Sequence, residues 1–76
     1  MNTTSDYAIT VVALGKTHHV SYVASLEALI KRAREIAMRN NSDVLIDRVA
    51  GGGVRRVPVG RLRFQRYKKR AVYVEA

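Results

Sequence analysis

The segment SLEALIKRAREIAMRN, residues 25–40, decides the fold because it carries the clearest helical pattern in the chain. Its apolar residues recur at steps of three and four, which forms one stripe along a helix of about four turns. Ser25 is a favourable N-cap and Asn tolerates the left-handed conformation of a helix end, so we expect a helix from Ser25 to about Asn40. Met38, at the edge of the stripe, is expected to fill the core. The stripe consists of Leu26, Leu29, Ile30, Ala33, Ile36 and Ala37.

Two strands are expected before this helix. Tyr7 to Leu14 alternates in the β-strand pattern, is rich in β-branched residues and stops at the turn signal Gly15-Lys16. Thr17 to Ala24 alternates again, so the two segments predict a hairpin. The polar segment 1–6 is expected to be a disordered N-terminus.

The chain after the helix returns to strand character. Val44 to Val49 and residues 54–57 predict a second hairpin around three consecutive glycines, and Pro58 is expected to end its second strand because proline has no amide to donate. Residues 60–65 alternate again, and Ala71 to Val74 either completes a third hairpin or pairs elsewhere in the sheet. This order predicts an α+β fold, an antiparallel sheet of four to six strands with a single helix packed on one face.

Length and composition indicate one small basic domain spanning residues 1–76. The chain is 47% hydrophobic, which is typical of a packed domain, and its formal net charge is +8. It contains no Cys, which excludes disulfides and thiolate zinc sites. No apolar run approaches the roughly 20 residues of a membrane span, so we expect a cytoplasmic protein without a membrane partner.

Positive charge is concentrated in the second half of the sequence. Residues 1–43 hold five basic and four acidic side chains, whereas residues 44–76 hold nine basic and two acidic ones. The eight cations between Ala50 and Val74 are interrupted by no acid, and most are Arg, whose planar fork suits phosphate and carboxylate. This pattern predicts a surface that binds nucleic acid or another anionic partner. Its expected residues are Arg55, Arg56, Arg61, Arg63, Arg66, Tyr67, Lys68, Lys69 and Arg70.

Alternation refines this prediction at two positions. If Leu62 and Phe64 enter the core, Arg61 and Arg63 face outward together from the opposite side of the strand.

Catalytic and metal chemistry find little support in the sequence. His18 and His19 are adjacent on a predicted strand and therefore point to opposite faces, which disfavours a shared metal ion. The six carboxylates show no spacing typical of acid-base or nucleophilic work. The three glycines are not followed by the Gly-Lys-Ser/Thr of a phosphate-binding loop. We therefore expect a non-enzymatic protein with no metal and no cofactor.

Two functions remain open from the residues alone. The basic surface binds nucleic acid directly through its phosphates with little sequence preference, or it docks on an acidic protein or nucleoprotein surface. A homodimer is also a possible arrangement, because one helix covers only one face of the predicted sheet and apolar residues such as Val12 occur on both faces.

In its layout the chain resembles the very small phage-encoded inhibitors of bacterial defence, in particular anti-CRISPR proteins that bind a multisubunit surveillance complex. One such group has a strand pair, a helix opening with Ser-Leu, two further strands and a basic-aromatic terminal strand. The matching segments are Ser25-Leu26 through Ala37, Val44 to Val49 and Arg66 to Val74. The resemblance covers most of the chain as architecture. It implies an inhibitor that blocks nucleic-acid binding by occupying a channel, or that recruits DNA to the wrong place.

Overall fold

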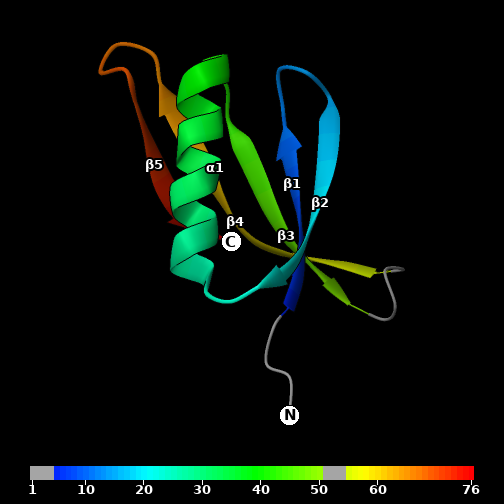
Figure 1. Cartoon of the computed structure of the whole chain (residues 1–76). Helices are drawn as coiled ribbons and strands as arrows, with labels where there is room; N and C mark the ends of the chain where they lie inside the picture. Colours follow the sequence, from blue (N-terminus) through cyan, green and yellow to red (C-terminus); the bar gives the residue numbers. More distant parts are fainter. Residues whose placement is uncertain (1–4, 51–54) are drawn as a thin grey trace.

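The described chain, residues 5–50 and 55–76 of a computed structural model, folds into one helix and one five-stranded sheet (Figure 1). The strands lie in the order β2-β1-β3-β4-β5, and every pair of neighbours is antiparallel. The helix packs on one face of this sheet, which confirms the predicted α+β class. The elements are β1 (Ser5–Val11), β2 (Lys16–Val23), α1 (Leu26–Asn40), β3 (Val44–Ala50), β4 (Arg55–Gln65) and β5 (Arg70–Glu75).

Both ends of α1 are capped as the sequence predicts. The Ser25 hydroxyl accepts a hydrogen bond from the Ala28 amide at 3.2 Å, and Asn41 adopts the left-handed conformation with φ 49°. The prediction for Met38 was wrong, because this side chain is 38% exposed. One residue after the buried Ala37, it is rotated about 100° around the helix axis and points beside the sheet rather than onto it.

The core lies between α1 and the sheet. The helix contributes Leu29, Ala33 and Ala37, which are all buried. The short side chains of the two alanines allow the helix to pack closely on the strands. The sheet supplies most of the large side chains of this cluster. They are Ile9, Val11, Val44, Ile46 and Leu62, each at most 2% exposed.

The α1 crossover connects two strands that are not neighbours. Strands β2 and β3 each pair antiparallel with β1, so they run parallel to one another with β1 between them. Figure 1 shows α1 crossing the sheet on one face and leaving the other face uncovered. We call the uncovered side the open face.

The first hairpin begins and turns earlier than expected. Ser5 and Asp6, expected from the sequence to be disordered, belong to β1, where they pair with Val23 of β2 and Val49 of β3. The strand ends at Val11, and residues 12–15 form the turn. Gly15 has φ 63°, which favours glycine at that position. The expected strand end at Leu14 was therefore wrong.

Pro58 does not end a strand, contrary to the sequence-based expectation. It lies inside β4, which runs without interruption from Arg55 to Gln65. The register between β3 and β4 shifts from Ile46 opposite Gly60 to Asp47 opposite Pro58, so β4 carries one extra residue there. A bulge of this kind accommodates a residue that lacks an amide hydrogen. The expected turn at residues 51–53 lies outside the described residues.

Strand β5 pairs with β4, which resolves the open alternative in favour of a third hairpin. At Gly60 the Tyr73 ring lies across the β4 backbone, and its hydroxyl donates to the Val59 carbonyl at 3.3 Å. Burial raises the pKa of the Tyr73 phenol, and the nearby Glu75 and Tyr7 raise it further. Because the Tyr73 ring lies so close to the β4 backbone, position 60 has no room for a side chain.

Replacing Leu29 with Ala should lower the free energy of unfolding by about 2–5 kcal/mol, because Leu29 is 3% exposed and its loss leaves a cavity under the helix. Chemical denaturation followed by circular dichroism measures this change. Lys31→Ala, on the exposed side of the same helix, is the control and should change stability by less than about 0.5 kcal/mol. Equal stability of the two variants would contradict the packing described above.

Gly60→Ala should destabilise the protein by about 1–3 kcal/mol, because a methyl group there would lie 2.6 Å from the Tyr73 hydroxyl oxygen and 2.7 Å from two ring carbons. The ring would have to move and give up its bond to Val59. Combining Gly60→Ala with Tyr73→Leu should cost less than the two single changes added together, as measured in a double-mutant cycle. Strict additivity would show that the ring and the glycine do not interact.

Candidate anion-binding surface

Arg61 and Arg63 project from the open face of the sheet. Arg61 is paired with Leu45 and Val74, and residues directly paired in neighbouring strands point to the same face. Leu62, between the two arginines, is fully buried under the helix. The predicted alternation therefore holds for Leu62 and the two arginines, whereas Phe64, expected in the core, is only partly buried.

The turn between β4 and β5 carries the next four predicted residues: Arg66, Tyr67, Lys68 and Lys69. All are exposed, and Tyr67 extends fully into solvent at 102% relative exposure. Lys69 adopts φ 49°, a left-handed residue that closes the hairpin. Arg70 opens β5, and its Nε donates to the Gln65 side-chain oxygen at 3.0 Å across the base of the turn. Residues 61–70 thus hold six cations and no acid; we call this segment the basic hairpin.

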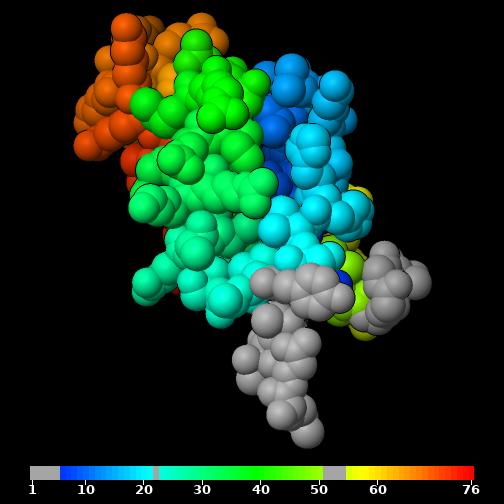
Figure 2. All heavy atoms as spheres, viewed as in Figure 1, coloured from blue at the N-terminus to red at the C-terminus, as the bar shows by residue number. Residues whose placement is uncertain are grey.

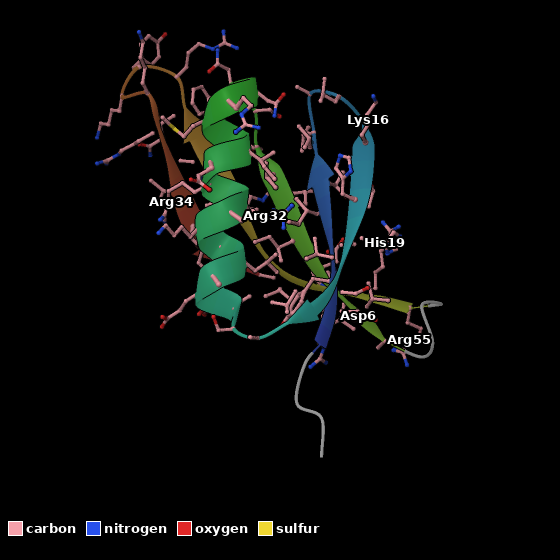
Figure 3. The ribbon with its side chains drawn as sticks, viewed as in Figure 1. Asp6, Lys16, His19, Arg32, Arg34 and Arg55 are labelled. Carbon is pink, nitrogen blue, oxygen red and sulfur yellow. The ribbon has the colours of Figure 1, made fainter. Side chains whose placement is uncertain are left out.

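Arg55 and Arg56 do not join the basic hairpin. They open β4 at its other end, and about 33 Å of extended strand lies between Arg55 and Gln65. Figure 3 shows Arg55 on the side of the molecule opposite the β4–β5 turn. The bulge turns Arg56 onto the open face, where it is paired with Val49, while Arg55 points the other way. The nine predicted residues therefore form two separate groups.

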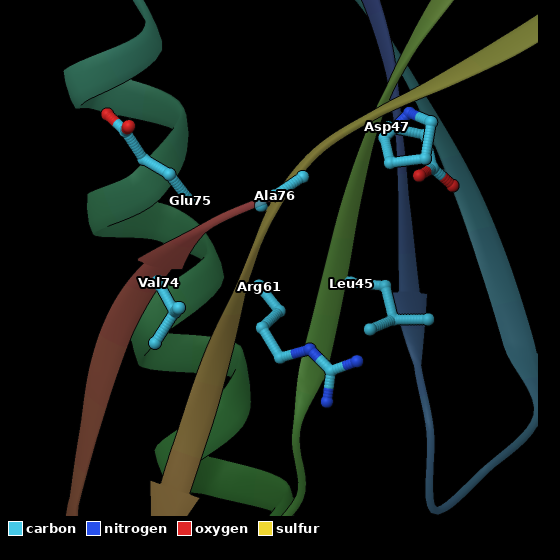
Figure 4. A pocket seen from close by; sticks show the side chains of 8 residues that line it. Leu45, Asp47, Arg61, Val74, Glu75 and Ala76 are labelled. Atoms are coloured by element: carbon cyan, nitrogen blue, oxygen red, sulfur yellow. The ribbon is translucent and has the colours of Figure 1, made fainter.

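Negative charge on the open face lies close to Arg56 and Arg61. A groove of about 400 Å³ on this face is lined by both Asp47 and Arg61, and in Figure 4 the Arg61 side chain extends toward Leu45 within it. Asp6 is paired with Val49, the residue that also pairs with Arg56. This part of the face therefore has mixed charge, whereas residues 63–70 contain five cations and no acid.

Asp43 ties the basic hairpin to the rest of the sheet. One carboxylate oxygen, Oδ1, accepts a hydrogen bond from the Phe64 amide at 2.9 Å, and the other lies 3.8 Å from an Arg61 guanidinium nitrogen. Arg61 remains about half exposed, so this ion pair is largely screened by water. The Asp43 carboxylate therefore holds β4 in place and partly neutralises Arg61, leaving Arg63 and the turn cations without this counter-charge.

Two further cations, Lys16 and Arg39, lie at the same end of the molecule and were missed in the sequence analysis. Lys16 follows the β1–β2 turn and Arg39 lies in the last turn of α1, and Figure 3 shows Lys16 at the end where the β4–β5 turn also lies. No sequence signal connects them with the basic hairpin, because they lie far from it along the chain. Arg34 is engaged elsewhere: its Nε donates to the Ala71 carbonyl at 3.2 Å, on the outer strand β5.

The two histidines occupy opposite faces of β2, as their adjacency predicts, with His18 paired with Ile9 and His19 with Ala8. Within residues 5–50 and 55–76, no group of three or more His, Asp or Glu side chains is placed to hold a metal ion. In the same described ranges, no helix has both the length and the apolar character needed to cross a membrane.

Comparisons with protein-family models, curated proteins and solved structures found no match to this chain.

Replacing Asp43 with Ala should cost about 1–3 kcal/mol of stability, because the partly buried Phe64 amide would lose its acceptor. Asp43→Asn should cost much less, since the amide oxygen still accepts that hydrogen bond. Thermal melts of both variants measure the difference. If Asn were as damaging as Ala, the ion pair with Arg61 rather than the hydrogen bond would be the stabilising contact.

Proposed function

We propose that this protein binds nucleic acid without enzymatic activity, mostly through phosphates and with little sequence preference. The observation that supports this proposal best is the basic hairpin, whose six cations lie within ten residues at one end of the sheet. Arg63, Lys68 and Lys69 are exposed there, and their guanidinium and ammonium groups suit phosphate oxygens.

The distribution of aromatic residues favours backbone contacts over base stacking. Tyr7 and Tyr73 pack against the core, and Phe64 shares the helix side of β4 with the buried Leu62. Among the side chains that the structure describes, Tyr67 is the exposed aromatic group near the cations. One tyrosine stacks on one base, whereas the surrounding charges contact several phosphates, so the salt-dependent electrostatic term dominates binding.

Titration of the protein with labelled duplex and single-stranded oligonucleotides at several salt concentrations tests this function. A surface occupying about four phosphates should give a slope of log K against log salt near −3.6 for a duplex. Replacing Arg63 and Lys68 with Gln should flatten that slope by about two units and leave the melting temperature unchanged, because both side chains are exposed.

Arg55 and Arg56 provide a matched control, since Arg55→Gln with Arg56→Gln removes the same charge at the opposite end of β4. This control should alter the slope by less than about half a unit. Equal effects of the two double variants would show that net charge, rather than the basic hairpin, determines binding.

The alternative proposal assigns the same cations to an acidic protein or nucleoprotein surface, as the resemblance to phage-encoded inhibitors implies. An absence of oligonucleotide binding at low salt would exclude direct binding and favour this docking function. Homodimerisation through the open face stays a prediction; Val12, which suggested it, lies in the β1–β2 turn.

A further inference from the structure

Exposed apolar side chains gather at one end of the molecule. In the described part of the chain, five large hydrophobic residues are markedly exposed, and four of them lie in or beside the turns at this end. The fifth, Val74, is 40% exposed near the end of β5, away from this end. The four are Val12 at 52%, Leu14 at 54%, Met38 at 38% and Tyr67 at 102%.

Three segments that are distant in sequence form this end, which we call the loop end: residues 12–16, 38–43 and 65–70. The Val12 amide donates to the Asp43 carbonyl at 3.1 Å, and the Ala13 amide donates to the Ser42 hydroxyl at 2.9 Å. These bonds join the first segment to the second. The second meets the third at a shallow hollow of about 290 Å³, lined by residues that include Met38 and Arg66. Figures 1 and 2 show all three at the same extremity.

Positive charge lies at the same end as these apolar groups. The loop end contains six cations and one acid, Asp43, whose carboxylate already accepts from the Phe64 amide and lies beside Arg61. Exposed apolar side chains together with cations are the complement of a surface that offers anionic headgroups above hydrocarbon. The six cations are Lys16, Arg39, Arg66, Lys68, Lys69 and Arg70.

We infer that the loop end docks peripherally on an anionic lipid surface. Leu14 and Tyr67 would enter the interfacial region from separate turns, and the cations would contact lipid phosphates. The aliphatic residues favour lipid over nucleic acid, because a phosphate backbone offers no apolar partner for Val12, Leu14 or Met38. Their position on separate projecting turns favours a soft surface over a shaped protein pocket. This inference goes beyond the proposed nucleic-acid function and differs from the expectation that membranes are not a partner.

Vesicle sedimentation with the full chain tests the inference. Vesicles of phosphatidylcholine and phosphatidylserine in equal amounts should bind the protein at least about tenfold more tightly than phosphatidylcholine alone, since the cations need anionic headgroups. Leu14→Ser should weaken binding to the anionic vesicles severalfold, and Tyr67→Ser likewise. Val74→Ser, at a similarly exposed apolar residue away from the loop end, is the matched control and should bind as the unmodified protein does.

The outcomes are separable from those of the proposed function. Leu14→Ser should leave oligonucleotide binding unchanged, because the basic hairpin is intact in that variant. Absence of vesicle binding would overturn the lipid proposal whatever the oligonucleotides show. Equal vesicle binding by Leu14→Ser, Tyr67→Ser and Val74→Ser would also overturn it, because attraction would then be purely electrostatic. All three side chains are exposed, and thermal melts confirm that each variant folds.

Discussion

The contact of the α1 stripe with the sheet is the constraint on which the rest of this small structure depends. Ala33 and Ala37 are completely buried, and their small side chains let the helix pack closely on the sheet, mainly over β4 and β5. Ile9, Ile46 and Leu62 fill the layer between them. A chain of 76 residues has few other ways to bury apolar surface, so the helix covers one sheet face, and Arg61 and Arg63 lie on the other.

This division explains why the basic residues are available for binding. Leu62 must point toward α1, and the pleat therefore sends Arg61 and Arg63 to the open face. Asp43 partly neutralises Arg61 and at the same time anchors β4 through the Phe64 amide. The charge that remains without a nearby acid lies farther along the hairpin, at the turn. The burial of Leu62 and the exposure of Arg61 and Arg63 thus both follow from the alternation of β4.

Local patterns in the sequence were sufficient for some features and insufficient for others. The helix, its caps and the orientation of Leu62 follow from periodicity and from short-range hydrogen bonds, which one segment determines by itself. Strand β4 continues through Pro58 because its register shifts against β3. A pattern within residues 54–60 alone carries no information about that neighbouring strand. The separation of Arg55 from the basic hairpin has a similar cause. Residues eight apart lie about 12 Å apart along a helix but about 26 Å apart along a strand, so a run of charge says little about a patch until the backbone is known.

The pairing of β1 with β3 is the pairing in the sheet that joins the most distant parts of the chain. Val11 and Val44 are partners although 33 residues separate them, whereas the β1–β2 and β4–β5 pairs are joined by short turns. Most of the loop-closure entropy that is lost when the sheet forms is therefore lost in the pairing of β1 with β3. Removal of β1 would leave β2 without a neighbour, even though β2, α1 and β3 would still follow one another along the chain. The N-terminal strand β1, one of the shorter elements of the fold, therefore joins β2 to the three strands β3, β4 and β5.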